Sequence, residues 1–544
     1  MQESTQTITF ANTKQRKCYV TKNDKIKSQY IMNSRKLLPF ALASIAGMNL
    51  TGATAQEHNQ RPNILLFLVD DMGWEDTSEP FWDSVVPQNR IYHTPNMERL
   101  ARQGMKFTHA YACPVSSPSR VSLMTGANVA QHQVSNWTLE KNKSTDAPHP
   151  TLDFGTWNFN GITPETGVEN AFYAKCLPEI LSENGYLTFI VGKAHLGALN
   201  TPAANPLNVG FDYNIAGHAA GAMGSYLGEE NYGNREKGGY TEPWGVPDLE
   251  AYHGTDVFLT EALTREASKL IDTALAQEKP FFLYMSHYAV HAPFKADKRF
   301  IQKYLDQGMD RNEAMYAAII EGMDKSLGDL MDFVEERGIS DNTIIIFMSD
   351  NGGYTVGRGG EKAQRNYPLR GGKGSCFEGG IREPLIVYYP GITEANTVNT
   401  TPVIIEDFFP TILELAGVKR YETPQHIDGK SFAKTLRTGK GDKKRAFYFH
   451  YPNYWGEFRE DIGVPQSAII EGDWKLVHYY ETGKNELYNL KEDIHERHDL
   501  SQEAGYGKLV REMASKLSDH LRHYHANMPY FKANGERCPY PDGQ

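Results

Sequence analysis

Four nearly uninterrupted apolar runs constrain the fold of this chain more than any other feature. They span residues 64–69, 187–191, 281–286 and 344–348. Because these runs lack the alternation of a half-exposed strand, they are typical of strands buried on both faces. Helical segments lie between them, such as 312–336, where apolar residues recur every three or four positions. The pattern predicts an α/β fold, with a large mixed, mainly parallel sheet sandwiched by helices.

The pattern changes past about residue 420, where short strand-like stretches alternate with Gly or Asn turns. These stretches lie within 445–455, 466–480 and 485–490, and a helix is expected over 506–525. We therefore expect a smaller C-terminal antiparallel sheet plus one helix. The predicted parts are an upstream extension with a signal peptide (1–55), a main α/β domain (56–420) and a C-terminal α+β subdomain (421–544).

The first 55 residues differ from the rest in composition. The stretch 35–55, "RKLLPFALASIAGMNLTGATA", has a basic start, a short apolar run and a small-residue end. This order is that of a secretory signal peptide with Gln56 as the mature N-terminus. Residues 1–31 are polar and fit no part of a signal, so we expect Met32 to be the true start. The protein is therefore expected to be secreted.

Composition and charge argue against two classes of protein. No apolar run approaches the length of a membrane-spanning helix. Of the 56 Lys and Arg, eight lie in residues 1–55, as do two of the 67 Asp and Glu, which leaves 48 against 65 and a net charge of −17. Such an acidic body argues against nucleic acid as a partner, although a local cluster of cations can still bind a small anion.

The cysteines point to neither a zinc site nor a disulfide-rich fold. Four of them follow residue 55: Cys113, Cys176, Cys376 and Cys538. Their spacing matches no zinc motif, and four scattered cysteines do not form a disulfide framework. The count leaves room for one or two bridges in an oxidising compartment.

Two of the predicted strands end in acidic residues. Asp70 and Asp71 follow the run 64–69, and Asp350 and Asn351 follow the run 344–348. In open α/β sheets, ligands bind beyond the carboxyl ends of the strands. Three carboxylates and an amide at one edge would repel one another unless a cation lay among them. Oxygen ligands favour a hard ion, so this pattern predicts a Ca²⁺ or Mg²⁺ site.

Basic side chains are expected near the same edge. Lys193 and His195 follow the second run, His291 follows the third, and Lys373 lies in a glycine-rich loop. Several cations beside a metal would bind and polarise an anion rich in oxygen, either phosphate or sulfate. His287, by contrast, is interpreted as a buried histidine with its hydrogen bonds satisfied.

The loop "ACPVSSPSRVSLMTG", residues 112–126, gathers small hydroxyl side chains beside an arginine. Pro114 and Pro118 each lack an N–H and restrict the preceding residue, so we expect the following helix to begin at Ser119. Hydroxyls at a helix entrance beside Arg120 suit an anion.

These motifs resemble those of the type I sulfatases of the alkaline-phosphatase superfamily. The family signature is Cys or Ser, then x-Pro-x-Arg, and later Leu or Met-Thr-Gly. Here it reads "SSPSR" from Ser116 to Arg120, followed by "VSLMTG". Further matching stretches are "NILLFLVDDMGW", "GKAHLG", "HAPF", "SDNGG", "KGSCFEGGIREP" and "DFFPTILELAG". The resemblance covers nearly all of the chain beyond the signal peptide.

The resemblance implies that Ser116 is oxidised after translation to formylglycine, whose hydrated gem-diol is the nucleophile. Cys113 is out of register with Pro118 and Arg120, so the chain is of the Ser type. That type implies maturation by an oxygen-independent, anaerobic bacterial enzyme. Together with the signal peptide, it places the expected location in a bacterial periplasm.

The resemblance also assigns roles to the other motif residues. The expected calcium ligands are Asp70, Asp71, Asp350, Asn351 and the oxygen on residue 116. The expected catalytic residues beside Ser116 are Arg120 and Lys193, which hold the formylglycine hydrate, His195, which takes the proton that releases sulfate, and His291 and Lys373, which bind sulfate and protonate or stabilise the leaving oxygen. Ala194 departs from the bulky aromatic residue of many relatives.

The sequence says less about the substrate. Long polar segments at 127–170 and 198–250 are expected to line the leaving-group pocket. His218 is the candidate for a sugar contact. Trp74, Trp137 and Trp244 are candidates for stacking on a pyranose ring, with burial in the protein interior as an equally good alternative for each. We also expect the stretch "FHYPNYWGE", from residue 449, to close over the pocket. A sulfated glycan, such as a mucin O-glycan or a glycosaminoglycan, is the expected substrate.

Two alternatives remain open at this stage. Phosphomonoester and phosphonate hydrolases share the metal and the fold, although a pocket with one metal and several Lys and His side chains suits a monoanionic sulfate ester better. The second alternative is a non-catalytic glycan-binding protein, in which Ser116 would stay unmodified.

Overall fold

The structure is a computed structural model that describes residues 61–234, 243–354, 365–456 and 461–543. The predicted upstream extension and signal peptide, 1–55, lie outside the described residues. Both expected later parts belong to one unit that runs from Asn59 to Gln544. The domain boundary at residue 420 therefore stays a prediction.

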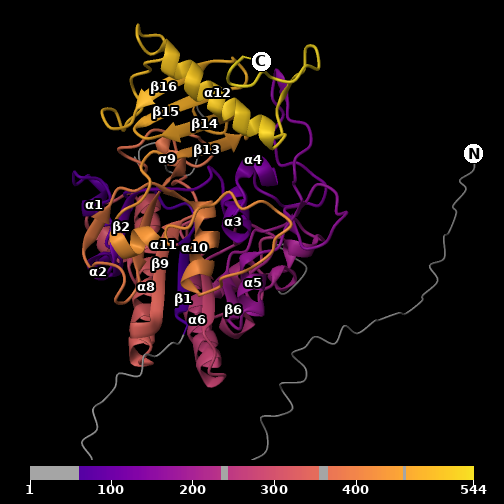
Figure 1. Ribbon diagram of the computed structural model, residues 1–544. Helices are drawn as coiled ribbons and strands as arrows, with labels where there is room; N and C mark the ends of the chain where they lie inside the picture. Colours follow the sequence, from indigo (N-terminus) through magenta and orange to yellow (C-terminus); the bar gives the residue numbers. More distant parts are fainter. Residues whose placement is uncertain (1–60, 235–242, 355–364, 457–460, 544) are drawn as a thin grey trace, which may run out of the picture. The chain divides into compact units, whose positions relative to one another are not determined.

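A nine-stranded sheet forms the centre of the described structure (Figure 1). The strand order is β11-β2-β10-β9-β1-β8-β6-β7, with β12 also paired to β2. The strands are β1 (Asn63–Val69), β2 (Met105–Tyr111), β6 (Leu187–Gly192), β7 (Tyr213–Ile215), β8 (Phe281–Ser286), β9 (Thr343–Ser349), β10 (Arg382–Tyr388), β11 (Thr397–Asn399) and β12 (Val403–Ile404). The four apolar runs of the sequence are β1, β6, β8 and β9, as predicted.

Strand direction confirms the mixed, mainly parallel sheet. β1 pairs in parallel with β8 and β9, so that Leu65 lies opposite Leu283 on one side and Ile345 on the other. β10 is antiparallel to both β9 and β2, and β2 therefore runs in the same direction as β1. The carboxyl ends of β1, β2, β6, β8 and β9 consequently meet at one edge, where β10 begins.

Alternate residues of β1 enter two different cores, which makes the fold a three-layer sandwich. Leu65, Phe67 and Val69 pack toward α2 (Pro95–Gln103), α6 (Leu259–Ala276) and α8 (Arg311–Glu336). Ile64, Leu66 and Leu68 pack toward α3 (Ser116–Thr125), α5 (Leu177–Glu183) and α10 (Phe408–Leu415). Burial of both faces explains why β1 is apolar throughout. The long helices α6 and α8 lie side by side (Figure 1).

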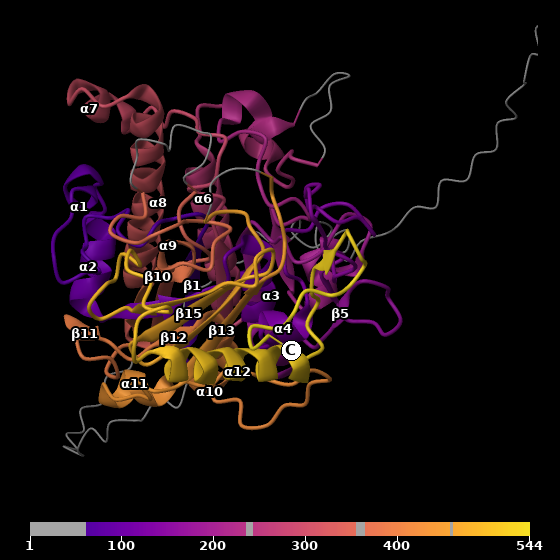
Figure 2. The same ribbon diagram turned by 90° about the horizontal axis from the view of Figure 1, so that it is seen from above.

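The C-terminal part contains the predicted antiparallel sheet and helix. The sheet has the order β13-β14-β15-β16, with bounds Ala446–Tyr451, Gln466–Glu471, Trp474–Tyr479 and Asn485–Asn489. One face packs on α12 (Gly507–His523), which lies alongside the sheet in Figure 2. The other face packs on apolar residues that include Tyr111, at the end of β2, and Phe377.

Shorter elements complete the described chain. The helices are α1 (Gln88–Ile91), α4 (Val129–His132), α7 (Ile301–Asp306), α9 (Glu378–Ile381) and α11 (Ala433–Thr438), and the small strands are β3 (Leu152–Asp153), β4 (Ile162–Thr163), β5 (Phe172–Tyr173) and β17 (Tyr530–Phe531). The 3₁₀ turns are Pro202–Ala204, Pro206–Val209, Gly228–Gly233, Glu250–Tyr252, Ser340–Asn342 and Ile405–Asp407.

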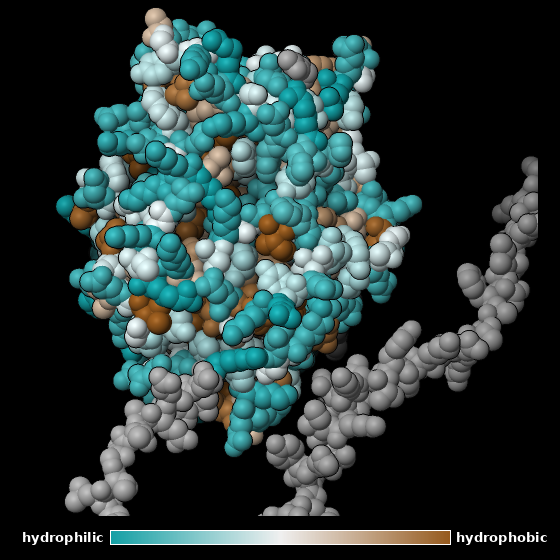
Figure 3. Space-filling view, viewed as in Figure 1, coloured by the Kyte–Doolittle hydropathy of each residue, from teal (hydrophilic) through white to brown (hydrophobic). Residues whose placement is uncertain are grey.

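The surface and the cysteines agree with the composition. Within the described ranges, no helix combines the length and the apolar character needed to cross a bilayer. On the face seen in Figure 3, apolar residues are scattered among polar ones. The four cysteines beyond residue 55 are buried free thiols, so the structure forms neither of the bridges for which the sequence left room.

Candidate active site

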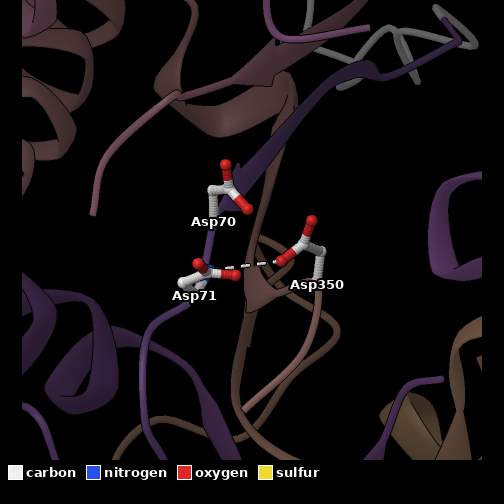
Figure 4. Close-up of side chains that lie close together, drawn as sticks. All are labelled: Asp70, Asp71 and Asp350. Carbon is white, nitrogen blue, oxygen red and sulfur yellow. Dashed lines mark hydrogen bonds between the residues drawn. The ribbon is translucent and has the colours of Figure 1, made fainter. Parts of the chain in front are cut away.

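Three carboxylates meet at the edge of the sheet where the parallel strands end. Asp70 and Asp71 directly follow β1, and Asp350 directly follows β9. Figure 4 shows the three side chains turned toward one another, and one oxygen from each lies within 4.8 Å of the other two. The Asp71 backbone N–H donates to Asp350 Oδ1 at 3.3 Å. All three are almost fully buried.

The donor set of this cluster fits a hard divalent cation. Asn351 adds an amide oxygen, because its Nδ2 donates to Asp71 Oδ1 at 2.8 Å while its Oδ1 points toward Ser116. Four side chains that offer oxygen ligands, with no imidazole or thiolate among them, favour Ca²⁺ or Mg²⁺ over zinc. Within the described ranges, this is the acidic cluster with the spacing of a metal site.

Ser116 lies directly beside this cluster. Its hydroxyl oxygen is 3.2 Å from Asp70 Oδ1 and 3.0 Å from Asn351 Oδ1. It is the first residue of α3, so the predicted helix start at Ser119 is wrong by three positions. Pro118 is tolerated because the N–H groups of a first helical turn have no intrahelical partner, so nothing is lost there. The positive end of α3 therefore points at the site.

Arg120, one turn further along α3, connects the helix to three strands. Its Nε donates to Asp350 Oδ2 at 2.9 Å, and Nη2 lies 2.8 Å from the same oxygen. Its Nη1 donates to Ser286 Oγ at 2.5 Å, to Tyr284 Oη at 3.2 Å and to the Lys193 carbonyl at 3.1 Å. The side chain is fully buried. Arg120 thus fixes the distance between Ser116 and the strand ends.

Two lysines pair with the remaining carboxylates. Lys193 Nζ is 2.8 Å from Asp70 Oδ2, and Lys373 Nζ is 2.6 Å from Asp71 Oδ1. Burial raises the pKa of Asp70 to about 7 and lowers the pKa of Lys193 to about 8. Burial disfavours the charged form of Asp71, yet Lys373 and His291 hold its pKa below the usual range.

The charges of the site balance without an ion. Each of the three carboxylates forms an ion pair with a basic side chain, and these are Arg120, Lys193 and Lys373. A carboxylate has about four lone-pair positions, so one ion pair leaves room for a metal. A divalent ion would therefore make the site positive by about two charges, which favours an anionic ligand in a chain that is acidic as a whole.

His195 follows β6 and holds a defined tautomer. Its Nε2 is 3.0 Å from the Thr138 carbonyl, which can only accept, so Nε2 carries the hydrogen. The buried Nδ1 has no hydrogen-bond partner. Burial, with Lys193 nearby, holds the pKa of His195 well below its ordinary value. The ring is therefore neutral, and Nδ1 is a free acceptor.

His291 lies on the other side of the carboxylates. Its Nδ1 donates to the Ala292 carbonyl at 2.5 Å, and its Nε2 is 3.6 Å from Asp71 Oδ2. Burial, with Lys373 nearby, lowers the pKa of His291 to about 3. His291 and Lys373 thus approach the same carboxylate from two segments that are far apart in the sequence.

A cavity of about 660 Å³ opens over these residues. Its polar lining includes Asp71, Ser116, Lys193, His195, His291 and Lys373. The lining also includes Trp137, Trp244 and Trp455, and the stretch from Gly221 to Gly224. A cavity lined by both charged and apolar residues suits a ligand with one anionic group and a larger uncharged body.

Comparisons with known proteins agree with this geometry. The profile of the sulfatase family matches residues 62–418, and that of the C-terminal region of N-sulphoglucosamine sulphohydrolase matches residues 372–523. A sulfatase of Formosa agariphila is 32% identical over 560 aligned positions, covering 93% of this chain and 97% of that protein. The chain belongs to the sulfatase family. The sulfatase is therefore an enzyme, a sulfuric ester hydrolase, with the alkaline-phosphatase-like fold.

Other relatives extend the likeness. The N-acetylgalactosamine-6-sulfatase of Mus musculus is 29% identical, covering 84% of this sulfatase and 85% of that protein. The crystal structure of Ps i-CgsB in complex with k-i-k-neocarrahexaose matches with a TM-score of 0.66 and 28% identity, covering 85% of this chain and 93% of that chain. The PsFucS1 sulfatase from Pseudoalteromonas sp. shares the fold, with a TM-score of 0.62, 23% identity and coverage of 86% and 92%.

Two of the residues considered for sugar contact in this sulfatase do not line the cavity. The His218 side chain is not among the residues that line the cavity, and its carbonyl instead accepts from the His195 N–H at 3.2 Å. The same loop reaches the cavity three residues later, at Gly221. Trp74 is buried under the guanidinium of Arg382 and away from the cavity. The burial of Trp74 agrees with the alternative left open for it, and the sugar contact of His218 stays a prediction.

Other residues lie where the sequence analysis expected them. Trp137 and Trp244, from the two long polar segments, line the cavity, and Trp455 brings in the stretch that was expected to close over it. His287 is buried as expected, and its Nε2 lies 2.9 Å from Ser326 Oγ. Its buried Nδ1 has no hydrogen-bond partner, so the expectation that all its hydrogen bonds are satisfied is wrong for that nitrogen. Sequence reasoning missed Ser286, although a polar residue at the end of a buried strand was the same signal that marked Asp70.

Proposed function

We propose that this sulfatase hydrolyses sulfate esters on a carbohydrate. The observation that carries the proposal is that Trp137, Trp244 and Trp455 line the same cavity as Lys193, Lys373 and Ser116. Indole rings can pack on the apolar C–H face of a pyranose, while the charged residues would receive a single sulfate group. A volume of about 660 Å³ is in the range of cavities that hold small organic ligands.

The names of the relatives support a saccharide substrate. The mouse relative is an N-acetylgalactosamine-6-sulfatase, and the Ps i-CgsB crystal contains a neocarrahexaose. Both align with more than four fifths of this chain. We therefore place the substrate among sulfated glycans, such as mucin O-glycans or glycosaminoglycans.

Two groups would complete the site. Asp70, Asp71, Asp350 and Asn351, with the oxygen on residue 116, would hold Ca²⁺, which would stabilise negative charge on the sulfate oxygens. Formylglycine at position 116, as its hydrated gem-diol, would supply a stronger nucleophile than the serine hydroxyl. The mixture of three carboxylates and one amide resembles the all-oxygen shell of calcium more than the largely hydrated shell of magnesium.

The residues of the chain would bind the sulfate and move the protons. Lys193 lines the same cavity as Ser116, and Arg120 lies one turn further along α3. Both would stabilise negative charge at residue 116. Lys373 and His291 would bind the sulfate and protonate or stabilise the oxygen of the leaving alcohol. His195 would take up a proton at Nδ1. The net reaction consumes one water and yields the free hydroxyl, sulfate and one proton.

The proposal includes the cellular setting. The signal-like stretch 35–55 supports export to a bacterial periplasm. The serine at position 116 supports maturation by an anaerobic formylglycine-generating enzyme.

The decisive experiment measures sulfate release from a panel of defined saccharides. N-acetylgalactosamine 6-sulfate, galactose 6-sulfate and N-acetylglucosamine 6-sulfate are compared with the corresponding 6-phosphates, using protein matured in an anaerobic bacterial host. We expect turnover of at least one sulfate ester and at least about 100-fold lower kcat/KM for its phosphate. Faster hydrolysis of the phosphate would favour a phosphomonoesterase, and turnover of none would favour a glycan-binding protein.

Mass spectrometry of the same preparation tests the modification. The peptide that contains Ser116 should be lighter by about two mass units after oxidation to the aldehyde. The Ser116→Ala variant should show an unmodified peptide and no turnover. An intact serine in an active preparation would refute formylglycine.

A further inference from the structure

A buried lysine lies in the apolar layer between the C-terminal sheet and the central sheet. Lys475, on β15, is fully buried. Its neighbour on the same face, Val477, packs with Phe377 and Tyr111, whereas Leu476 points to the opposite face and packs under α12. Nothing in the reaction proposed above uses Lys475.

Two buried glutamates surround this lysine. Lys475 Nζ lies 2.9 Å from Glu378 Oε1 and 2.8 Å from Glu496 Oε1. Glu496 Oε2 also accepts from the Glu378 backbone N–H at 2.7 Å. Arg382 Nη1 donates to Glu378 Oε2 at 3.1 Å. Two acids and two bases therefore balance in a layer that excludes water.

Glu378 ends the loop that carries Lys373. The base of this loop is closed by the Gly379 N–H, which donates to the Arg370 carbonyl at 2.7 Å. Inside the loop, the Gly374 N–H donates to the Pro114 carbonyl and the Gly374 carbonyl accepts from the Gly463 N–H, each at 2.8 Å. The loop is thus bonded to the segment before Ser116 on one side and to the C-terminal subdomain on the other.

We propose that Lys475 is a positioning residue, which holds the Lys373 ammonium in the sulfate site by anchoring Glu378 and Glu496. Replacing a buried ion pair by apolar side chains is often neutral or stabilising, so stability alone does not explain a lysine in this layer. The ion pair does fix the position of the Glu378 side chain, because Glu378 must stay within hydrogen-bond distance of Lys475. This inference rests on the proposed function in one respect, that Lys373 binds the sulfate group.

The Lys475→Met variant tests the anchor, and Leu476→Ala is its matched control. The methionine keeps the volume but leaves Glu378 and Glu496 facing each other with one base fewer, so the loop should move. We expect kcat/KM for N-acetylgalactosamine 6-sulfate, or for whichever panel ester is turned over, to fall at least tenfold. Leu476→Ala removes packing on the other face of the same strand and should lower the melting temperature while kcat/KM stays within about twofold.

A double variant separates charge balance from packing. Lys475→Met with Glu496→Gln removes one base and one acid, so one acid, Glu378, is left with one base, Arg382, and the charges balance as in the wild type. We expect at least half of the lost kcat/KM, on a logarithmic scale, to return. Equal losses in the single and double variants, or an equal loss in Leu476→Ala, would overturn the proposal. Should Lys475→Met fail to fold, Glu496→Gln alone must lower kcat/KM at least threefold, and an unchanged value would overturn it.

Hydrogen exchange gives a readout that needs no turnover. Amides of residues 371–377 should exchange faster in Lys475→Met than in the wild type, and those of β14 should change less. Leu476→Ala should show the reverse order. If no sulfate ester of the panel is hydrolysed, the proposed function fails, while unchanged exchange in 371–377 would refute the anchor itself.

Discussion

At the scale of single residues, the site requires glycine at position 221, where a larger side chain would collide with His195. A Cβ built on Gly221 would lie 2.2 Å from Cε1 and 2.3 Å from Nδ1 of His195. Atoms cannot approach so closely, so residue 221 has to be glycine if His195 is to keep its place. Gly221 therefore packs directly against the His195 ring, close to Nδ1, the ring nitrogen without a hydrogen-bond partner.

Gly221→Ala should therefore impair turnover more than folding. The methyl group must displace the His195 ring, and loss of a positioned acid–base group typically costs about 100-fold to 10,000-fold in rate. We expect kcat to fall at least about tenfold, with KM within about threefold, in steady-state assays on the best panel ester. Gly507→Ala, where the nearest atom is 3.5 Å away at the start of α12, is the control. Unchanged kcat in Gly221→Ala would show that His195 carries no proton in the limiting step.

At the scale of elements, α3 shows how a helix is built into a site. All ten of its residues are buried. Its C-terminus is closed by Gly126 in the left-handed region, with a φ of 68°, where the N–H donates to the Ser122 carbonyl at 2.8 Å. Its N-terminus carries Ser116. Arg120 sets the position of the helix, because its guanidinium reaches Asp350, Ser286 and Lys193 together.

Arg120→Lys should lower both stability and turnover, although it keeps the positive charge. A lysine cannot donate in two directions from a planar group, so the bonds to the strand ends are lost. Hydrogen bonds of charged groups contribute about 1.5–3 kcal/mol each, and we expect the free energy of unfolding to fall by at least about 2 kcal/mol in urea titrations. Turnover should fall below a tenth of the wild-type rate.

Arg99→Lys is the control for this substitution. Arg99 pairs with Asp332 and Glu335 at the surface, where ion pairs contribute about 0–1 kcal/mol. The free energy of unfolding of the Arg99→Lys variant should differ from that of the wild type by less than about 0.5 kcal/mol. An equally small change in Arg120→Lys would mean that the bonds to the strand ends do not hold α3.

Elements also show what the sequence could and could not reveal. β1, β6, β8 and β9 were predictable because strands buried on both faces leave an unmistakable apolar run. β2 and β10 were not identified, since β2 has a mixed pattern of buried and half-buried residues and β10 begins with Arg382 and Glu383. The site residues that follow predictable strands could be found. The place of His218 could not be predicted in this way, because it lies in a loop whose course is set by tertiary contacts.

At the scale of the whole molecule, charges are unevenly distributed. The sequence has a formal net charge of −11, yet the lining of its cavity includes Lys193 and Lys373. Three carboxylates from the ends of two strands lie next to these lysines. Such a cluster links the two strands most tightly when a divalent ion joins the carboxylates, so ion binding should be coupled to the stability of the entire fold.

Calcium should therefore raise the melting temperature of the intact protein. A ligand that binds the folded state alone stabilises it by about 2.7 kcal/mol at 100 times its Kd. We expect thermal unfolding several degrees higher in millimolar CaCl₂ than in EDTA, and a smaller shift with MgCl₂, which prefers a more hydrated shell. Asp350→Asn should abolish the calcium shift, whereas Asp519→Asn, at an exposed position on α12, should retain it. Identical melting curves of the wild type in CaCl₂ and EDTA would mean that Asp70, Asp71 and Asp350 are held together by their lysine and arginine partners alone.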